Sequence, residues 1–132
     1  MSAVAPSGAR PPAHRGHVPR GRAWWWTVGT GAALLVLMAV HIVANHFVVD
    51  EVGGLRTYHQ VLEYLSHPVI VVTESLLLIV VTIHAMLGVR GVLLDLDMRP
   101  RTRRRVDGGL VTLGGATIAY GLFLLLTLAS RA

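Results

Sequence analysis

Residues 68–94 read PVIVVTESLLLIVVTIHAMLGVRGVLL, a nearly unbroken apolar run that decides the fold. A helix crosses the hydrocarbon core of a bilayer with about 20 such residues. Two further runs of similar character lie before and after it. We therefore predict an all-α membrane protein with three transmembrane helices, at about 24–49, 68–96 and 108–129.

Composition supports a membrane protein. The chain has 132 residues, of which 53% are hydrophobic and only 14% charged, which is too apolar for an ordinary soluble domain. Cysteine is absent, so disulfides, thiolate metal sites and cysteine nucleophiles are excluded. The net charge of +5 comes from arginines beside the apolar runs, which favours a membrane surface over nucleic acid. The first run is too long for a signal-peptide core and is predicted to be a mature helix.

The flanking charges predict the orientation. Arginines without any acid precede the first span, and five more lie in DLDMRPRTRRRVD, residues 95–107. The segment between the first two spans is net negative. By the positive-inside rule, the N-terminus and the 95–107 loop face the cytoplasm, in a cytoplasmic (inner) membrane. Trp24, Trp25 and Trp26 are typical of an aromatic anchor at the inner interface.

The segments outside the spans have distinct characters. Residues 1–21 are rich in Pro, Gly, Ala and Arg and are predicted to be a disordered basic tail, so that 22–132 forms the anchor domain. After the Gly53-Gly54 turn signal, LRTYHQVLEYLS predicts a short helix on the outer surface. Ser66 and Pro68 are typical of a helix start, as cap and first-turn residue. The glycines of GGLVTLGGA, 108–116, permit close helix packing.

His84 is the most conspicuous polar residue within a span. Gly88, Gly91 and Asp95 follow it at offsets of four, seven and eleven, which place all four on one helical face. His84 lies roughly 16 Å from the cytoplasmic end of its helix. Imidazole is a good axial ligand of haem iron, and glycines on the same face would admit a flat macrocycle or a partner helix. The alternative is a histidine that bonds a neighbouring carbonyl.

His41 lies roughly 27 Å into the first span and therefore nearer the outer face than His84. A single haem could hardly use both histidines. Two stacked haems fit the two depths, each taking one ligand from this chain and one from a partner subunit. His46 is nearer the interface, where hydrogen bonding is the simpler role.

Three charged residues of the second span also have alternative roles. Asp95, at the cytoplasmic boundary, could exchange protons near a quinone headgroup or simply pair with Arg99 or Arg90. Arg90 could snorkel to the surface or hold a haem propionate. Glu74 could pair with a partner helix and is assigned no role. Such polar groups are costly in lipid, so we expect packing against another membrane subunit or a cofactor.

The residues HAMLGVRGVLLDLD, 84–97, resemble the second-helix signature of the membrane-anchor subunits of succinate dehydrogenase and fumarate reductase. That signature is His, three residues, Gly, and then Asp after a short stretch. TGAALLVLMAVH, 30–41, resembles the Ser/Thr-Gly followed by a histidine in the first helix of some members. Three helices and an arginine-rich inner loop also agree.

The resemblance implies that the chain is a non-catalytic anchor subunit, without dicarboxylate chemistry of its own. It implies His84 as axial ligand of a haem b near the cytoplasmic side, His41 as ligand of a second haem, and Asp95 beside the quinone. The implied partners are a second membrane-anchor subunit, an iron–sulfur subunit that docks on 99–105 and the tail, and a flavoprotein subunit that oxidises succinate in the tricarboxylic acid cycle. A Tyr frequent in the family is replaced here by Leu96, and a frequent Arg is replaced by Val28. Other subunits would then supply those groups of the quinone site.

Two other functions remain open from the sequence. The chain could be the cytochrome b subunit of another membrane oxidoreductase, although those usually need another helix and both haem ligands in one chain. It could also be a cofactor-free structural or transport accessory subunit. A dinucleotide fingerprint and a phosphate-binding loop are both missing from the sequence.

Overall fold

The computed structural model describes residues 21–47, 57–96 and 99–132, and these residues form four helices and no strand. Three helices are long: α1 (Arg22–Phe47), α3 (Pro68–Leu94) and α4 (Pro100–Ala129), with a short α2 (Tyr58–Leu65) between the first two. The three long helices lie where the apolar runs predicted them. The predicted tail, apart from residue 21, and the Gly53-Gly54 turn fall outside the described residues.

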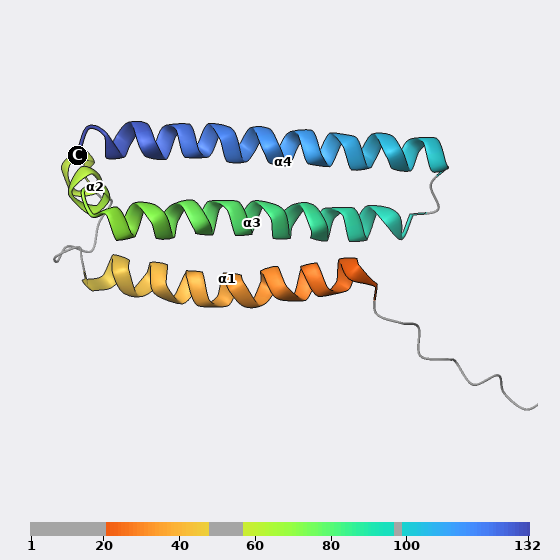
Figure 1. Ribbon diagram of the computed structural model, residues 1–132, viewed down its shortest axis with the longest axis horizontal. Coiled ribbons are helices and arrows are strands. Elements are labelled where there is room, and N and C mark those ends of the chain that lie inside the picture. The colour runs from red at the N-terminus through yellow and green to blue at the C-terminus, as the bar shows by residue number, and fades with distance from the viewer. Residues whose placement is uncertain (1–20, 48–56, 97–98) are drawn as a thin grey trace, which may run out of the picture.

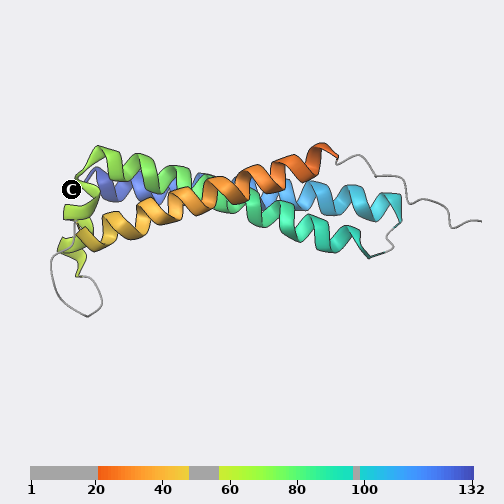
Figure 2. The ribbon, with the colours of Figure 1, turned by 90° about the horizontal axis from the view of Figure 1, so that it is seen from below.

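The long helices form a single layer with α3 in the middle (Figure 1). α3 contacts α1 on one side and α4 on the other, whereas within the described helices no contact joins α1 to α4. Figure 2 shows that α1 crosses over α3 at an angle, while α2 lies across one end of the layer. We refer to this as the α2 end, and to the opposite end, where α4 begins, as the arginine end.

Two of the long helices, α3 and α4, begin at prolines. Pro68 and Pro100 occupy the first turns of α3 and α4, where the fixed backbone angle of proline suits a helix and no N–H partner is needed. α4 therefore starts eight residues before the predicted 108. Arginine is a good helix former, so Arg101, Arg103, Arg104 and Arg105 lie on the first turns of α4 and not in a loop.

The short helix α2 was predicted, but its junction with α3 was not. Thr57 begins α2 with a capping box, in which its side chain accepts from Gln60 N–H and the Gln60 side chain accepts from Thr57 N–H. Ser66 was expected to cap the following helix, and this was wrong. Its hydroxyl donates to the Glu63 carbonyl at 2.6 Å and so ends α2, which leaves His67 as the residue before α3.

The interior of the layer is small. Tyr64, Leu65 and Ile70 form the buried core at the α2 end, and α1 contributes no fully buried residue. α3 and α4 approach closely at two glycines: a Cβ on Gly114 would lie 3.0 Å from the Met86 side chain, and one on Gly121 would lie 2.6 Å from the Leu78 side chain. Glycines at such points let membrane helices pack backbone to side chain.

Most of the remaining apolar surface is exposed. Leu35 and Val69 are each 77% exposed, and large apolar side chains are exposed on all three long helices. The long helices contain 26, 27 and 30 residues, and each is long and apolar enough to span a bilayer. In water so much exposed apolar surface would drive aggregation, so lipid or other membrane helices must cover it. The chain is therefore a multi-pass membrane protein.

Candidate functional site

His84 is held between α3 and α1. Its Nδ1 lies 3.0 Å from the hydroxyl oxygen of Thr30, and its Cε1 would lie only 3.3 Å from a Cβ at position 31, which is glycine. The adjacent residues Thr30 and Gly31 thus have separate tasks, because Thr30 bonds the ring and Gly31 leaves room for it. This geometry answers one question left by the sequence: the partner of His84 is a hydroxyl on the neighbouring helix and not a backbone carbonyl.

The hydrogen bonds of Thr30 indicate which ring nitrogen of His84 carries the proton. The Thr30 hydroxyl lies 2.7 Å from the Trp26 carbonyl, to which it donates as helical threonines do. With the hydroxyl hydrogen directed at a backbone carbonyl, the Thr30 oxygen accepts from Nδ1–H of His84, and Nε2 is the ring nitrogen left with a lone pair. A histidine with Nδ1–H fixed in this way is oriented to bind a metal through Nε2.

The rest of the His84 face is open. A Cβ at Gly88 or Gly91 would meet nothing within 4 Å, and both glycines are exposed. Asp95 ends α3 at the arginine end and is exposed as well. No other helix of the described chain therefore covers this face between His84 and Asp95.

His41 belongs to a second polar group, nearer the α2 end. Its Nδ1 lies 2.6 Å from Oε1 of Glu74, and the hydroxyl of Tyr64 donates to the same oxygen, also at 2.6 Å. Asn45 Nδ2 donates to the Tyr64 oxygen at 3.1 Å and to the His41 carbonyl at 2.7 Å. Three helices, α1, α2 and α3, meet in this group of His41, Asn45, Tyr64 and Glu74. We refer to it as the outer cluster, because the flanking charges of the sequence predict that the α2 end faces outward.

The outer cluster orients His41 much as Thr30 orients His84. A carboxyl oxygen that accepts from Nδ1–H leaves Nε2 of His41 as the nitrogen available to a metal. The Glu74 side chain is only 14% exposed, which is unusual for a carboxyl group and is explained by its two partners. Glu74 and His84 are ten residues apart on α3, or roughly 15 Å along the helix, so the two histidines lie at different depths.

Arg90 pairs with α4 and not with its own helix. Its Nε donates to Oδ1 of Asp107 at 2.7 Å. The sequence offered Asp95 as a partner for Arg90 or Arg99, yet among the described residues Asp95 forms no ion pair with either. Arg90 is six residues after His84, about 120° away around α3, and its predicted role at a haem propionate stays a prediction.

The remaining histidines of the described chain lie toward the α2 end. Among the described residues, no three His, Asp or Glu side chains gather closely enough to hold a metal ion by themselves. His46 and His59 are exposed near the α2 end, and His67 precedes α3. A haem supplies four nitrogens of its own, so it needs only a single axial histidine from this chain, and the arrangement of His84 or His41 fits that requirement.

Three contacts were not predicted from the sequence. They are the hydrogen bond of Thr30 to His84, that of Tyr64 to Glu74, and the ion pair of Asp107 with Arg90. Thr30 and Tyr64 lie 54 and 10 residues from their partners, and only the packed helices show that they meet. The sequence did indicate that Glu74 needs a partner. A carboxyl group inside an apolar span must find a partner, and two donors on neighbouring helices supply it.

Comparison with known proteins agrees with this architecture. The profile of the family described as succinate dehydrogenase/fumarate reductase transmembrane subunit matches residues 12–128. The chain is 32% identical over 107 residues to a protein of Archaeoglobus fulgidus named succinate dehydrogenase hydrophobic membrane anchor subunit, covering 80% of this chain and 88% of that protein. Since the match spans all three long helices and both histidine groups, the chain belongs to the family of succinate dehydrogenase/fumarate reductase transmembrane subunits.

Proposed function

We propose that this chain anchors a succinate:quinone oxidoreductase in the cytoplasmic membrane and supplies His84 as an axial ligand of haem b. Family membership supports the anchoring role. The observation that carries the ligand assignment is the Thr30–His84 hydrogen bond, which leaves Nε2 of a half-buried imidazole with its lone pair. The open face over Gly88 and Gly91 gives a flat macrocycle access to the helix.

A bound haem accepts and passes on single electrons between the iron–sulfur subunit and quinone. The task of this chain is to hold it. His84 would provide one ligand, Thr30 would fix the direction of the imidazole, and a second membrane-anchor subunit would provide the other ligand. In the same way His41, oriented by Glu74, holds a second haem nearer the α2 end. The roughly 15 Å between the two levels on α3 favours two haems over one shared haem.

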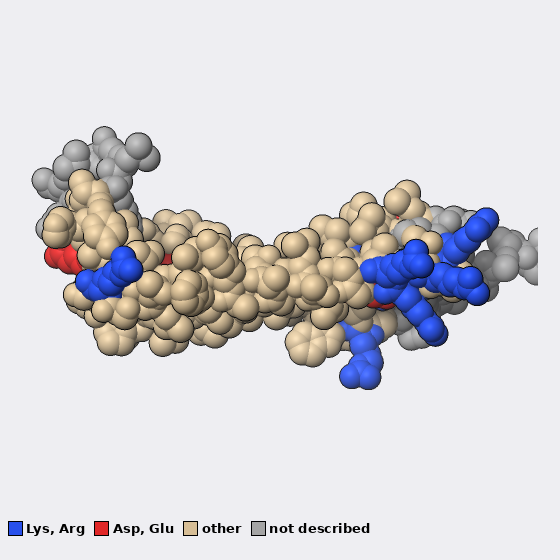
Figure 3. Space-filling model, turned by 90° about the horizontal axis from the view of Figure 1, so that it is seen from above, with Lys and Arg blue, Asp and Glu red and all other residues tan. Residues whose placement is uncertain are grey.

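The arginine end is the proposed cytoplasmic side. Figure 3 shows arginine side chains gathered there, and Arg99, Arg101, Arg103, Arg104 and Arg105 are all exposed. Such a surface attracts both anionic lipids and an acidic protein surface. We assign it to docking of the iron–sulfur subunit, whose flavoprotein partner carries out the succinate chemistry. Asp95 lies at the same end of α3, as a residue beside quinone would.

This function is tested by purifying the complex through a tag on this chain. We expect a flavoprotein, an iron–sulfur protein and a second small membrane protein to co-purify, together with a b-type band in the reduced-minus-oxidised spectrum. Partners of another kind, with the band present, would favour a different membrane oxidoreductase. The expected partners without the band would leave the anchor assignment intact and refute the haem assignment.

Replacing Thr30 by valine tests how His84 is oriented. The change keeps the size of the side chain and removes the oxygen that accepts from Nδ1, so the ring loses its fixed direction. Loss of such a partner typically lowers metal affinity about 10- to 100-fold. We expect weaker retention of the His84 haem, measured as haem lost during gel filtration. Thr27→Val is the control, because the Thr27 hydroxyl bonds only the Ala23 carbonyl of its own helix. Equal retention in both variants would refute the role of Thr30.

A further inference from the structure

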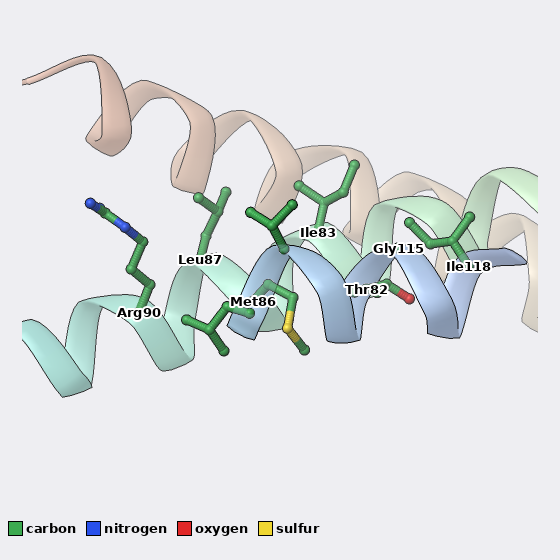
Figure 4. A pocket seen from close by; sticks show the side chains of 10 residues that line it. Thr82, Ile83, Met86, Leu87, Arg90, Gly115 and Ile118 are labelled. Atoms are coloured by element: carbon green, nitrogen blue, oxygen red, sulfur yellow. The ribbon is translucent and has the colours of Figure 1, made fainter. Parts of the chain in front are cut away.

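An apolar groove lies between α3 and α4 in the half of the layer nearer the arginine end. Its volume is about 230 Å³, and Thr82, Met86, Leu110 and Ile118 are among its walls. Figure 4 shows the groove running between the two helices from Arg90 at one end to Ile118 at the other. Apart from Arg90 and Thr82, the side chains that line it are apolar.

Two adjacent glycines of α4 shape this groove. Gly114 is buried against Met86, which sets the close approach of the two helices. Gly115 is exposed, and a Cβ there would meet nothing within 4 Å, so the missing side chain keeps the groove open. The volume of about 230 Å³ and the almost wholly apolar lining can take part of a hydrocarbon chain. Val111 on its rim is 75% exposed, so the groove opens sideways toward the bilayer.

Positive charge surrounds one end of the groove. Arg90 lines it and bonds Asp107 through Nε, and Arg103 acts electrostatically on the same carboxylate. Arg90, Arg103 and Asp107 together carry a net charge of about +1. A guanidinium has five N–H donors, so Arg90 can keep Asp107 and still bind a second acceptor through its Nη atoms. Arg103 precedes Asp107 by four residues and shares its helical face.

We propose that this groove binds an anionic phospholipid, with one acyl chain between α3 and α4 and its phosphate at Arg90 and Arg103. The combination of features identifies the occupant. A narrow apolar groove open to the bilayer accepts a hydrocarbon chain, and the net positive end, at the level where lipid headgroups lie, favours an anionic headgroup over a zwitterionic one. A helix of a partner subunit would need an acidic residue placed at that end.

The test uses the complex purified through this chain and stripped of lipid in detergent. It is titrated with dioleoyl phosphatidylglycerol or dioleoyl phosphatidylcholine, and bound lipid is counted by native mass spectrometry. We expect one phosphatidylglycerol per copy of this chain to bind more tightly than phosphatidylcholine. Gly115→Leu fills the groove and should abolish this binding. Gly109→Leu, on the opposite side of α4, is the control and should bind as wild type.

The headgroup is tested by two arginine variants of equal charge change. Arg103→Gln should raise the apparent Kd for phosphatidylglycerol about fivefold, as expected for the loss of one arginine near a headgroup, and leave phosphatidylcholine unaffected. Arg105→Gln should have no effect, because residues 105 and 107 are about 160° apart around the helix. Equal effects of both arginine variants, or unchanged binding by Gly115→Leu, would overturn the proposal. Loss of a partner subunit from the Gly115→Leu complex would also overturn it and identify a helix as the occupant.

Discussion

Replacing His84 by alanine is expected to lower the haem content of the purified complex by one haem b per copy of this chain. Nε2 of His84 is the proposed ligand, and alanine provides no atom that could replace it. Haem is quantified from the reduced-minus-oxidised spectrum and by extraction as the pyridine complex. Because the Thr30–His84 hydrogen bond contributes only about 0.5–1.5 kcal/mol to folding, the helices should still assemble.

His59→Ala is the matched control for this substitution. His59 is an exposed residue of α2, away from the site between α1 and α3, so its loss should leave the haem content unchanged. His84→Ala that retains every haem would remove His84 as a ligand. His84→Ala could also lose its haem because the partner subunits dissociate. His84→Gln distinguishes this outcome from loss of the ligand, because its side chain can still hydrogen-bond Thr30 but is a poor haem ligand.

The sequence predicted the three spans and the short outer helix because each depends on local pattern. Continuous apolar runs of the right length determine membrane helices almost irrespective of their packing. The start of α4 was harder to predict, because six of the eight residues before the apolar run are polar or charged and hydropathy places the boundary after them. Helix propensity and Pro100 extend the helix beyond the apolar run. Ser66 shows the same limit: it can end one helix or begin the next, and only the backbone decides.

The sequence did not predict which residues of different helices contact one another. That His84 meets Thr30 depends on the rotation and relative height of α1 and α3, which no pattern within one helix determines. The same holds for Arg90, which had nearer acidic candidates in the sequence and pairs with Asp107 on α4. The polar residues within spans nevertheless indicated where such contacts must form, because each one requires a partner.

Glu74→Leu is expected to have the largest effect on stability. It removes the oxygen that accepts from both His41 and Tyr64, while the apolar replacement fits the membrane. Interhelical hydrogen bonds in membranes contribute on average about 0.6 kcal/mol each and at most about 1.7, and a stranded donor adds a desolvation penalty of about 1–3 kcal/mol. We expect a loss of about 1–3 kcal/mol in total, after allowing for partial exposure of His41, seen as a lower Tm in detergent.

Comparison of related variants separates the hydrogen bonds of Glu74 from its volume. Glu74→Gln retains an oxygen that can accept from both Tyr64 and His41, although without the negative charge, and should recover most of the loss. Ser75→Ala, next to it on α3, removes a hydroxyl that bonds only the Val71 carbonyl of the same helix and should change stability by less than about 0.5 kcal/mol. A Tm of Glu74→Leu equal to that of Ser75→Ala would show that the outer cluster does not hold α1, α2 and α3 together.

The same series also tests the outer haem independently of stability. If Glu74 fixes Nδ1–H of His41, then Glu74→Gln should weaken the donor strength of Nε2 and raise the midpoint potential of the haem bound there. A tenfold shift in the one-electron equilibrium corresponds to 59 mV, which a redox titration resolves, and the His84 haem should not shift. A changed Tm without any shift in potential would leave Glu74 as a structural residue, and an unchanged haem count in His41→Ala would remove His41 as a ligand.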